Sequence, residues 1–146
     1  MNRFCFLILI WTLFPFHVFS EETFLSLKKN KVNVRYGPGF EYPIKYVYKK
    51  IDLPIKQIDK KENFRRIIDL KNNGGWIHVS QLKKVSSIIP EKDTILFSKP
   101  TNFSKPLAKI KRGRMLLLKK CEERWCKVSS QDHVGWVKKE YAWGLN

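Results

Sequence analysis

The amino-acid sequence predicts an all-β protein that contains two small β-barrels in tandem. Three observations support this prediction: blocks of sequence recur later in the chain, apolar residues alternate with period two in short runs, and glycine and proline stand at the ends of those runs. No stretch after residue 20 has helical periodicity. Each copy has about fifty to sixty residues, near the lower limit for a chain that folds alone.

The repeat is clearest in two blocks. Residues 62–67, Glu-Asn-Phe-Arg-Arg-Ile, resemble residues 123–128, Glu-Arg-Trp-Cys-Lys-Val. Gly75-Trp76-Ile77 recurs as Gly135-Trp136-Val137. The register between other blocks drifts slightly, as expected of two copies of one fold, because loops tolerate changes of length.

Short strands separated by turns are expected in both copies. In the first copy the alternation and apolar runs predict strands at residues 31–35, 44–48, 54–58, 64–70 and 76–79. In the second copy they predict strands at residues 94–97, 107–110, 115–118, 125–129 and 134–138. Charged residues 59–63, Gly37-Pro38-Gly39 and residues 72–75 are expected to be turns, the last two because glycine accepts positive φ. Residues 83–92 are expected to form the linker.

The N-terminus has the three parts of a secretory signal peptide. A short basic start, Met1-Asn2-Arg3, precedes a mainly apolar run over residues 4–19, and Val18 and Ser20 suit cleavage before Glu21. The run is short for a membrane span, which needs about 20 apolar residues, and an uncleaved anchor is the alternative. We therefore expect residues 1–20 to be the signal peptide, residues 21–85 and 86–146 to be the two domains, and the mature protein to be periplasmic or secreted.

The chain carries a large positive charge. It has 29 Lys and Arg against 13 Asp and Glu, a formal net charge of +16. Such a field attracts polyanions, among which nucleic acid, anionic lipid headgroups and anionic wall polymers all qualify. Export argues against nucleic acid as the physiological partner, and a membrane contact is expected only through an uncleaved signal.

Two cysteines remain after the expected signal, which contains Cys5. Cys121 and Cys126 bracket four residues, and if these form a hairpin loop the two Cβ atoms lie opposite each other, so that a disulfide can form in an oxidising compartment. A zinc site needs four ligands, and only His78 and His133 are there to add. A catalytic thiol needs a free sulfur and a nearby base. We expect the disulfide, and neither a metal nor a cofactor.

Several motifs in order resemble those of bacterial Src-homology-3 (SH3) domains. They are Val32-Asn33-Val34-Arg35 with Gly37-Pro38-Gly39, then Tyr42-Pro43-Ile44, residues 62–67, and Gly75-Trp76-Ile77-His78. The chain is similar to exported tandem proteins of this type in Gram-negative bacteria, over about residues 28–143. In that group the divergent second copy carries a cysteine pair around a tryptophan, as Cys121 and Cys126 do here. The second copy has Leu96-Phe97-Ser98-Lys99-Pro100 in place of the opening motif.

The resemblance implies partly open β-barrels that bind cell-wall peptides, or another envelope partner, without catalysis. Five residues of the first copy are candidates for ligand contact: Tyr36, Phe40, Tyr42, Arg65 and Trp76. Aromatic rings offer large contact area at low entropic cost, and an arginine can grip a carboxylate as a fork. The competing interpretation is structural: core packing for the rings, and a solvated strand face for arginine.

Three hypotheses of function follow, and in each the protein is expected to be a monomer. The first is a non-enzymatic module that recognises peptidoglycan stem peptides or an anionic glycan of the envelope. The second is a scaffold that binds another envelope protein, since the exposed strand edges of a small barrel accept an added strand. The third is a wall hydrolase built on Cys126, which we disfavour because the chain has no room for a separate catalytic domain.

Overall fold

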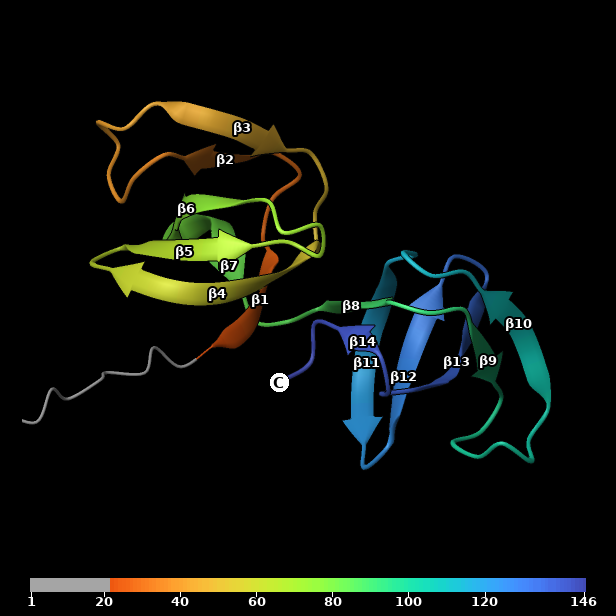
Figure 1. Ribbon diagram of the computed structural model, residues 1–146. Coiled ribbons are helices and arrows are strands. Elements are labelled where there is room, and N and C mark those ends of the chain that lie inside the picture. The colour runs from red at the N-terminus through yellow and green to blue at the C-terminus, as the bar shows by residue number, and fades with distance from the viewer. Residues whose placement is uncertain (1–21) are drawn as a thin grey trace, which may run out of the picture.

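Two antiparallel sheets make up the described part of the protein, and each curves around its own core (Figure 1). The structure is a computed structural model, and it describes residues 22–146. The expected signal peptide, residues 1–20, lies outside the described residues. Within residues 22–146 the single helical element is the short 3₁₀ turn η1 (Val79–Gln81), so the all-β prediction is confirmed. No helix in this part of the chain is long and apolar enough to cross a membrane.

The first sheet forms the first domain. Its strands are β1 (Thr23–Leu27), β2 (Val32–Arg35), β3 (Ile44–Tyr48), β4 (Pro54–Lys61), β5 (Phe64–Ile68), β6 (Gly74–His78) and β7 (Leu82–Lys83). Their order in the sheet is β3-β2-β6-β5-β4-β1-β7.

The second sheet has the same topology. Its strands are β8 (Ser87–Pro90), β9 (Thr94–Phe97), β10 (Pro106–Ile110), β11 (Leu116–Glu122), β12 (Trp125–Ser130), β13 (His133–Lys138) and β14 (Ala142–Trp143). Their order, β10-β9-β13-β12-β11-β8-β14, is the order of the first sheet with every strand replaced by the one seven places later. One fold is therefore built twice, as the sequence repeat predicts.

The strand register aligns the two copies residue by residue. Phe64 lies opposite His78 on β5 and β6, and Trp125 lies opposite Lys138 on β12 and β13. Farther along the same strands, Gly75 and Gly135 occupy corresponding positions, opposite Ile67 and Val128. The blocks that resemble each other in the sequence thus occupy equivalent places in the two sheets.

The sequence does not predict β1, β7, β8 or β14, and it places β8 in a linker over residues 83–92. This is wrong because all four residues of β8 are buried, in a strand that lies between its own sheet and the first domain. A strand covered in this way loses the alternation that marks a half-exposed strand. The expected turn at residues 59–63 is also shorter than predicted, since β4 continues through exposed residues to Lys61.

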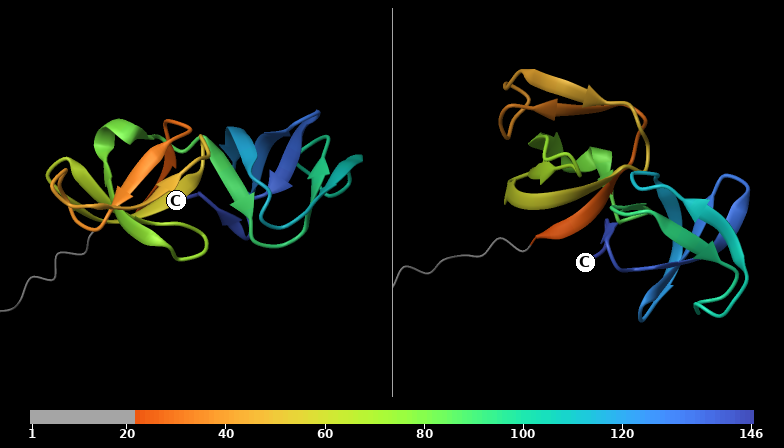
Figure 2. Two further views of the ribbon diagram at one scale, coloured as in Figure 1. Left: turned by 90° about the horizontal axis from the view of Figure 1, so that it is seen from above. Right: turned by 45° about the vertical axis from the view of Figure 1, so that its right-hand side comes forward.

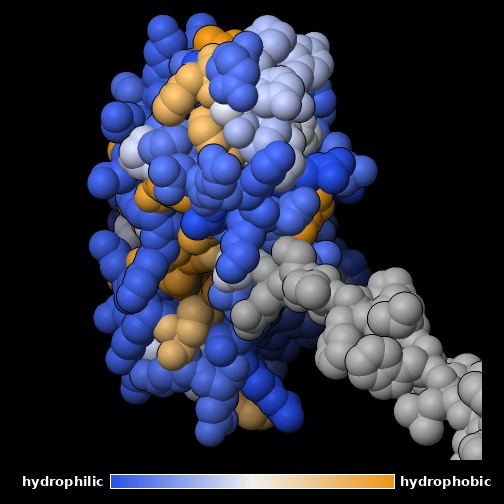
Figure 3. All heavy atoms as spheres, turned by 90° about the vertical axis from the view of Figure 1, so that its left-hand side faces the viewer, coloured by the Kyte–Doolittle hydropathy of each residue, from blue (hydrophilic) through white to orange (hydrophobic). Residues whose placement is uncertain are grey.

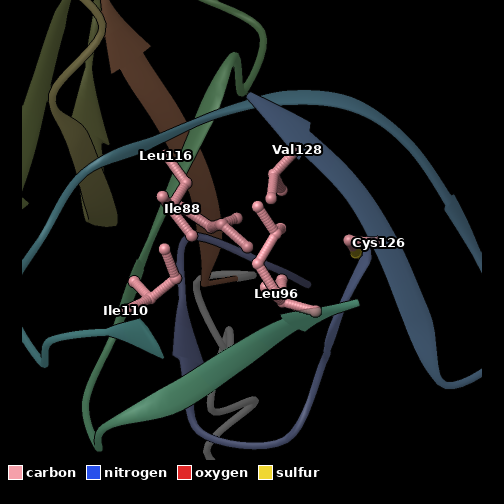
Figure 4. Close-up of a cluster of buried hydrophobic side chains, with 7 residues drawn as sticks. Ile88, Leu96, Ile110, Leu116, Cys126 and Val128 are labelled. Atoms are coloured by element: carbon pink, nitrogen blue, oxygen red, sulfur yellow. The ribbon is translucent and has the colours of Figure 1, made fainter. Parts of the chain in front are cut away.

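Each domain has a separate apolar core. The buried residues of the first core are Leu27, Val32, Val34, Ile55, Ile67 and Ile77. Those of the second, shown in Figure 4, are Ile88, Leu96, Ile110, Leu116, Cys126, Val128 and Val137. Full burial of such a side chain stabilises the fold by about 1.5–3 kcal/mol relative to exposure. On the face shown in Figure 3, apolar side chains appear only as separate patches among hydrophilic ones.

A polar cluster joins the two domains at Asp52. Its carboxylate accepts hydrogen bonds from the Lys83 ammonium at 2.5 Å and from the Ser86 hydroxyl at 2.7 Å. Ser87 donates to the Asp52 carbonyl, and the Ser86 amide donates to the hydroxyl of Ser26 at 3.0 Å. The bond from Lys83, helped by that from Ser86, holds the pKa of the Asp52 carboxyl below its usual value, against the opposing effect of burial. The serines of the expected linker therefore hold the domains together.

The last strand adds an apolar contact to this junction. Trp143 packs edge-to-face on Phe24, with ring centroids 4.9 Å apart, and its Nε1 donates to the carbonyl of Pro54 at 3.0 Å. The side-chain oxygen of Asn146 accepts from the amide of Phe24 at 2.8 Å. The C-terminal segment consequently lies beside β1 of the first domain (Figures 1 and 2).

Candidate binding site

A pocket of about 490 Å³ opens on the outer face of the first domain. Among the residues that line it are three cationic and two aromatic side chains: Arg35, Lys45, Arg66, Tyr36 and Trp76. Trp76 of β6 lies directly opposite Arg35 of β2 on one side and Arg66 of β5 on the other. Residues opposite one another in antiparallel strands project from the same face, so the register places an Arg-Trp-Arg row across three strands.

The three cations differ in what they already bind. Arg35 donates to the carbonyls of Tyr42 at 2.8 Å and Phe40 at 3.3 Å, which fixes the loop between β2 and β3. The Lys45 ammonium donates to the carbonyl of Gly74 at 3.0 Å. The Arg66 guanidinium makes no hydrogen bond or ion pair with any residue in the described part of the chain, and its side chain is exposed. Arg66 is therefore the cation of this pocket that is available to a ligand.

Tyr36 and Trp76, both expected to contact ligand, lie at this pocket. Tyr36 is 63% exposed and its ring faces the Lys45 ammonium, 5.7 Å from the ring centroid. Trp76 is half-buried. Two rings beside a free guanidinium offer apolar contact next to a positive charge.

Arg65, the arginine expected to contact ligand, does not line the pocket. Its Nη1 donates to the carbonyls of Glu62 at 2.9 Å and Phe64 at 3.0 Å, so it braces the β4–β5 turn. Because side chains alternate along a strand, Arg65 shares the side of buried Ile67, and the neighbouring Arg66 takes the outer face. Alternation along the strand is the sequence signal that could have distinguished Arg66 from Arg65. Arg35 and Lys45 are also missed by the sequence reasoning.

Phe40 belongs to a separate aromatic cluster. Its ring lies 5.2 Å from that of Phe64 and 5.1 Å from that of His78, measured between centroids. The Arg35 guanidinium lies 5.4 Å from the centroid of Phe40. Arg35 therefore connects this cluster with the pocket, while Phe40 remains 64% exposed.

Tyr42 has a structural contact within the β2–β3 loop. A Cβ placed on Gly37 would lie 2.4 Å from the Tyr42 ring, so the ring packs where a side chain at position 37 would stand. Glycine is expected in this turn because it accepts positive φ, but neither Gly37 nor Gly39 has positive φ. In the turn over residues 72–75 it is Asn72, with φ of 64°, that takes the left-handed conformation.

The corresponding loop of the second domain has the same backbone shape without the Gly-Pro-Gly motif. The Ser98 amide donates to the Lys105 carbonyl at 2.9 Å, as Tyr36 does to Pro43 at 3.2 Å. At the tip of the first loop, the Gly39 amide donates to the Gly37 carbonyl and the Tyr42 amide to the Gly39 carbonyl. At the tip of the second loop, the Thr101 amide donates to the Lys99 carbonyl and the Ser104 amide to the Thr101 carbonyl in the same way. Position 37 thus corresponds to Lys99, and position 42 to Ser104.

The Arg-Trp-Arg row of the first domain has different residues in the second domain. By register, Arg35 is replaced by Phe97, Arg66 by Lys127 and Trp76 by Trp136. Trp136 is only 8% exposed. The second domain therefore lacks both the pair of arginines and the accessible tryptophan, and the candidate site belongs to the first domain.

The disulfide expected between Cys121 and Cys126 is present. The two residues form a cross-strand pair beside the β11–β12 turn, with Cα atoms 4.0 Å apart. Cys126 is fully buried in the second core. At the equivalent place the first domain has the pair Lys60 and Arg65.

The sequence model of the bacterial SH3 domain matches residues 28–84 and again residues 91–144. The chain belongs to the bacterial SH3 domain family. Two structures similar to this tandem SH3 chain are those of NlpC2 and NlpC1 from Trichomonas vaginalis, each with 10% sequence identity and a TM-score of 0.39. They cover 84% and 86% of this chain, which in turn spans 48% and 46% of their lengths, about half of each. No curated protein sequence matches the chain.

Membership of this family bears on the broad function. Bacterial SH3 domains commonly bind the cell wall, and they occur in extracellular or envelope proteins. The two matched segments correspond to the two sheets, so each domain is an SH3-like unit.

Proposed function

We propose that this protein is a non-catalytic, exported binding module that recognises carboxylate-bearing peptides of the cell wall through the pocket of its first domain. The observation that carries the proposal is the free guanidinium of Arg66 beside Trp76 and Tyr36. A guanidinium binds a carboxylate through two parallel hydrogen bonds, and the adjacent rings contact the aliphatic part of a peptide. Peptidoglycan stem peptides offer both groups.

The absence of catalysis and the location in the envelope are part of the same proposal. A hydrolase built on Cys126 needs a free thiolate, whereas the sulfur of Cys126 is bonded to that of Cys121 in a buried position. The signal-like sequence over residues 1–20 supports export to the periplasm or beyond. The disulfide supports an oxidising compartment as well.

Sedimentation of the mature protein with purified peptidoglycan sacculi tests the proposal. We expect the protein to bind at physiological salt and Arg66→Ala to weaken binding at least tenfold, since loss of a charge-assisted fork costs about 1.5–3 kcal/mol. A salt series separates specific binding from general attraction, because screening weakens exposed charge interactions. The proposal fails if the wild-type protein stays in the supernatant at physiological salt.

Arg65→Ala is the matched control for Arg66→Ala. It removes the same charge from the adjacent residue, but Arg65 binds backbone carbonyls outside the pocket. We expect it to lower the melting temperature slightly and to leave sacculus binding within about twofold of wild type, a change below about 0.5 kcal/mol. Equal loss of binding in both variants would show that net charge, not the pocket, is responsible.

A second candidate function is a scaffold that binds another envelope protein, and one side chain favours it. Phe103 stands on the loop between β9 and β10 and is 99% exposed. The loop that carries it is closed by hydrogen bonds from the Ser104 hydroxyl to the carbonyls of Lys99 and Thr101. Exposed aromatic side chains of this kind are common anchors of protein interfaces. Cross-linking in intact cells from position 103 tests this candidate: recovery of wall fragments without any protein would exclude it.

A further inference from the structure

A second charged surface, separate from the arginine pocket, surrounds the junction of the two domains. We name it the junction lysine surface. Its members come from the β1–β2 loop, the β3–β4 loop, the end of β7 with the residue after it, and β11. They are Lys28, Lys29, Lys31, Lys49, Lys50, Lys83, Lys84 and Lys119.

Register and hydrogen bonds place these segments together. Val32 pairs with Tyr48, so Lys31, just before β2, lies beside Lys49, just after β3. The Asp52 amide donates to the Leu27 carbonyl at 3.0 Å, which brings the β3–β4 loop beside the residues after β1. Figures 1 and 2 show both loops at the end of the first domain that faces the second.

The surface continues onto the second domain. Ser86, which binds Asp52 of the first domain, accepts a hydrogen bond from the Leu118 amide at 2.9 Å. Lys119 follows Leu118 directly and is exposed. The surface therefore depends on the junction that fixes one domain against the other.

The nearby carboxylates neutralise only part of this surface. Asp52 is bound by Lys83 and Ser86, and Asp69 is bound by the Tyr48 hydroxyl and the side chain of Asn73. Within residues 22–146, Lys83 is the one member of the surface with a carboxylate within 4.0 Å. Eight lysines against two aspartates leave a surplus of six positive charges here, within a formal net charge of +16 for the whole chain.

The kind of cation indicates the kind of anion. Every cation of this surface is a lysine, whereas two of the three cations at the pocket of the first domain are arginines. Lysine is a compact, strongly hydrated point charge that binds phosphate, and it lacks the planar fork that matches a carboxylate. The two charged regions therefore suit different anions.

We infer that the junction lysine surface binds a linear polymer that carries phosphate groups at regular spacing. The lysines come from four segments and two domains, so they match an extended chain of charges better than a single anion. The exposed aromatic side chains of the described residues, Tyr36, Phe40, Tyr42, Phe103 and Tyr141, all belong to other segments. The surface therefore has no strongly exposed ring of the kind that stacks nucleobases or anchors proteins in membrane interfaces.

Inorganic polyphosphate is a suitable probe, measured by titration of the folded mature protein at several salt concentrations. The test variant carries Lys49→Ala, Lys50→Ala, Lys84→Ala and Lys119→Ala. The control variant carries Lys60→Ala, Lys61→Ala, Lys99→Ala and Lys105→Ala, which removes the same charge from exposed lysines elsewhere. Thermal melts verify that both variants fold as the wild type does.

We expect the test variant to bind polyphosphate at least tenfold more weakly and the control less than threefold more weakly. The slope of log affinity against log salt should become shallower by about three to four in the test variant, since each phosphate contact contributes about 0.7–0.9 to it. Equal losses in both variants would overturn the proposal, because net charge alone would then explain binding. Tighter binding to vesicles of anionic lipid, lost in the test variant, would also overturn it by making the surface a membrane contact. Sacculus binding by the test variant should be unchanged, which separates this site from the arginine pocket.

Discussion

The Tyr42 ring occupies the space in which a side chain at position 37 would stand, with Cδ1 only 2.4 Å from the place of a Cβ on Gly37. The second domain shows how this constraint is relieved. Its equivalent loop has Lys99 at the glycine position and Ser104 at the tyrosine position, and the backbone hydrogen bonds are the same. Glycine is therefore required at position 37 by a neighbouring ring and not by the backbone conformation.

Gly37→Ala should destabilise the first domain by about 1–3 kcal/mol, the usual cost of forcing extra volume into a packed site. The double variant Gly37→Ala/Tyr42→Ser should recover most of this loss, because the ring is removed as in the second domain. Urea unfolding followed by circular dichroism measures both. A double variant as unstable as Gly37→Ala would show that the loop needs glycine for another reason.

Asp52 should make the contact between the domains sensitive to acid. The pKa of the Asp52 carboxyl is lowered in the folded protein, chiefly by Lys83. The ionised carboxylate therefore stabilises the folded protein fully above the usual pKa of about 4, and this stabilisation is lost as the pH falls through the lowered pKa. The indole N–H signal of Trp143, which is bonded to Pro54, reports the junction in NMR spectra. We expect this signal to shift below about pH 4 in the wild type.

Asp52→Asn provides the control for that titration. Its side chain keeps an oxygen that can accept from Ser86 but carries no charge for Lys83. The Trp143 signal should then lose the transition expected below about pH 4, and the variant should be less stable than the wild type at pH 7. An unchanged acid transition would assign it to another carboxylate.

The disulfide should contribute modest stability. Cys121 and Cys126 are separated by five positions, so the closed loop is short and its effect should stay below about 3 kcal/mol. Cys126→Ser should be more destabilising than Cys121→Ser, because a serine at position 126 also buries a hydroxyl in the second core. Urea unfolding with and without reductant measures these differences, and equal effects of the two substitutions would contradict the assigned role of Cys126.

The two equivalent tryptophans should respond differently to truncation. Trp136 is nearly buried, so Trp136→Ala should cost about 3–5 kcal/mol of stability. Trp76 is half-buried at the pocket, so Trp76→Ala should cost less than half of this and should weaken sacculus binding. Thermal melts and sedimentation with sacculi measure the two effects separately. Unchanged sacculus binding by Trp76→Ala would remove this ring from the proposed site.

Repetition made most of the fold predictable from the sequence. The alternation at Val32 and Val34 locates β2, and the recurrence of Gly75-Trp76-Ile77 locates β6 and β13. The strands β1, β7, β8 and β14 are not predictable in this way. They lie where the two domains meet, and their burial depends on contacts between residues far apart in the chain.

The candidate site was predictable in part. The aromatic side chains Tyr36 and Trp76 stand out by type, and both line the pocket. Arg66 is distinguished from Arg65 only by the side of the strand that each takes. Lys45 and Arg35 join the pocket through the pairing of β2 with β3 and β6, which is a property of the assembled sheet.

The bond between Asn146 and Phe24 has a consequence for the order of folding. These residues are 122 positions apart, and closing so long a stretch of chain costs more conformational entropy than forming any hairpin within a domain. Each sheet can form from nearby segments, whereas the seam between the first strand and the last residues needs both sheets in place. The seam should therefore be the last part of the molecule to assemble and the first to come apart.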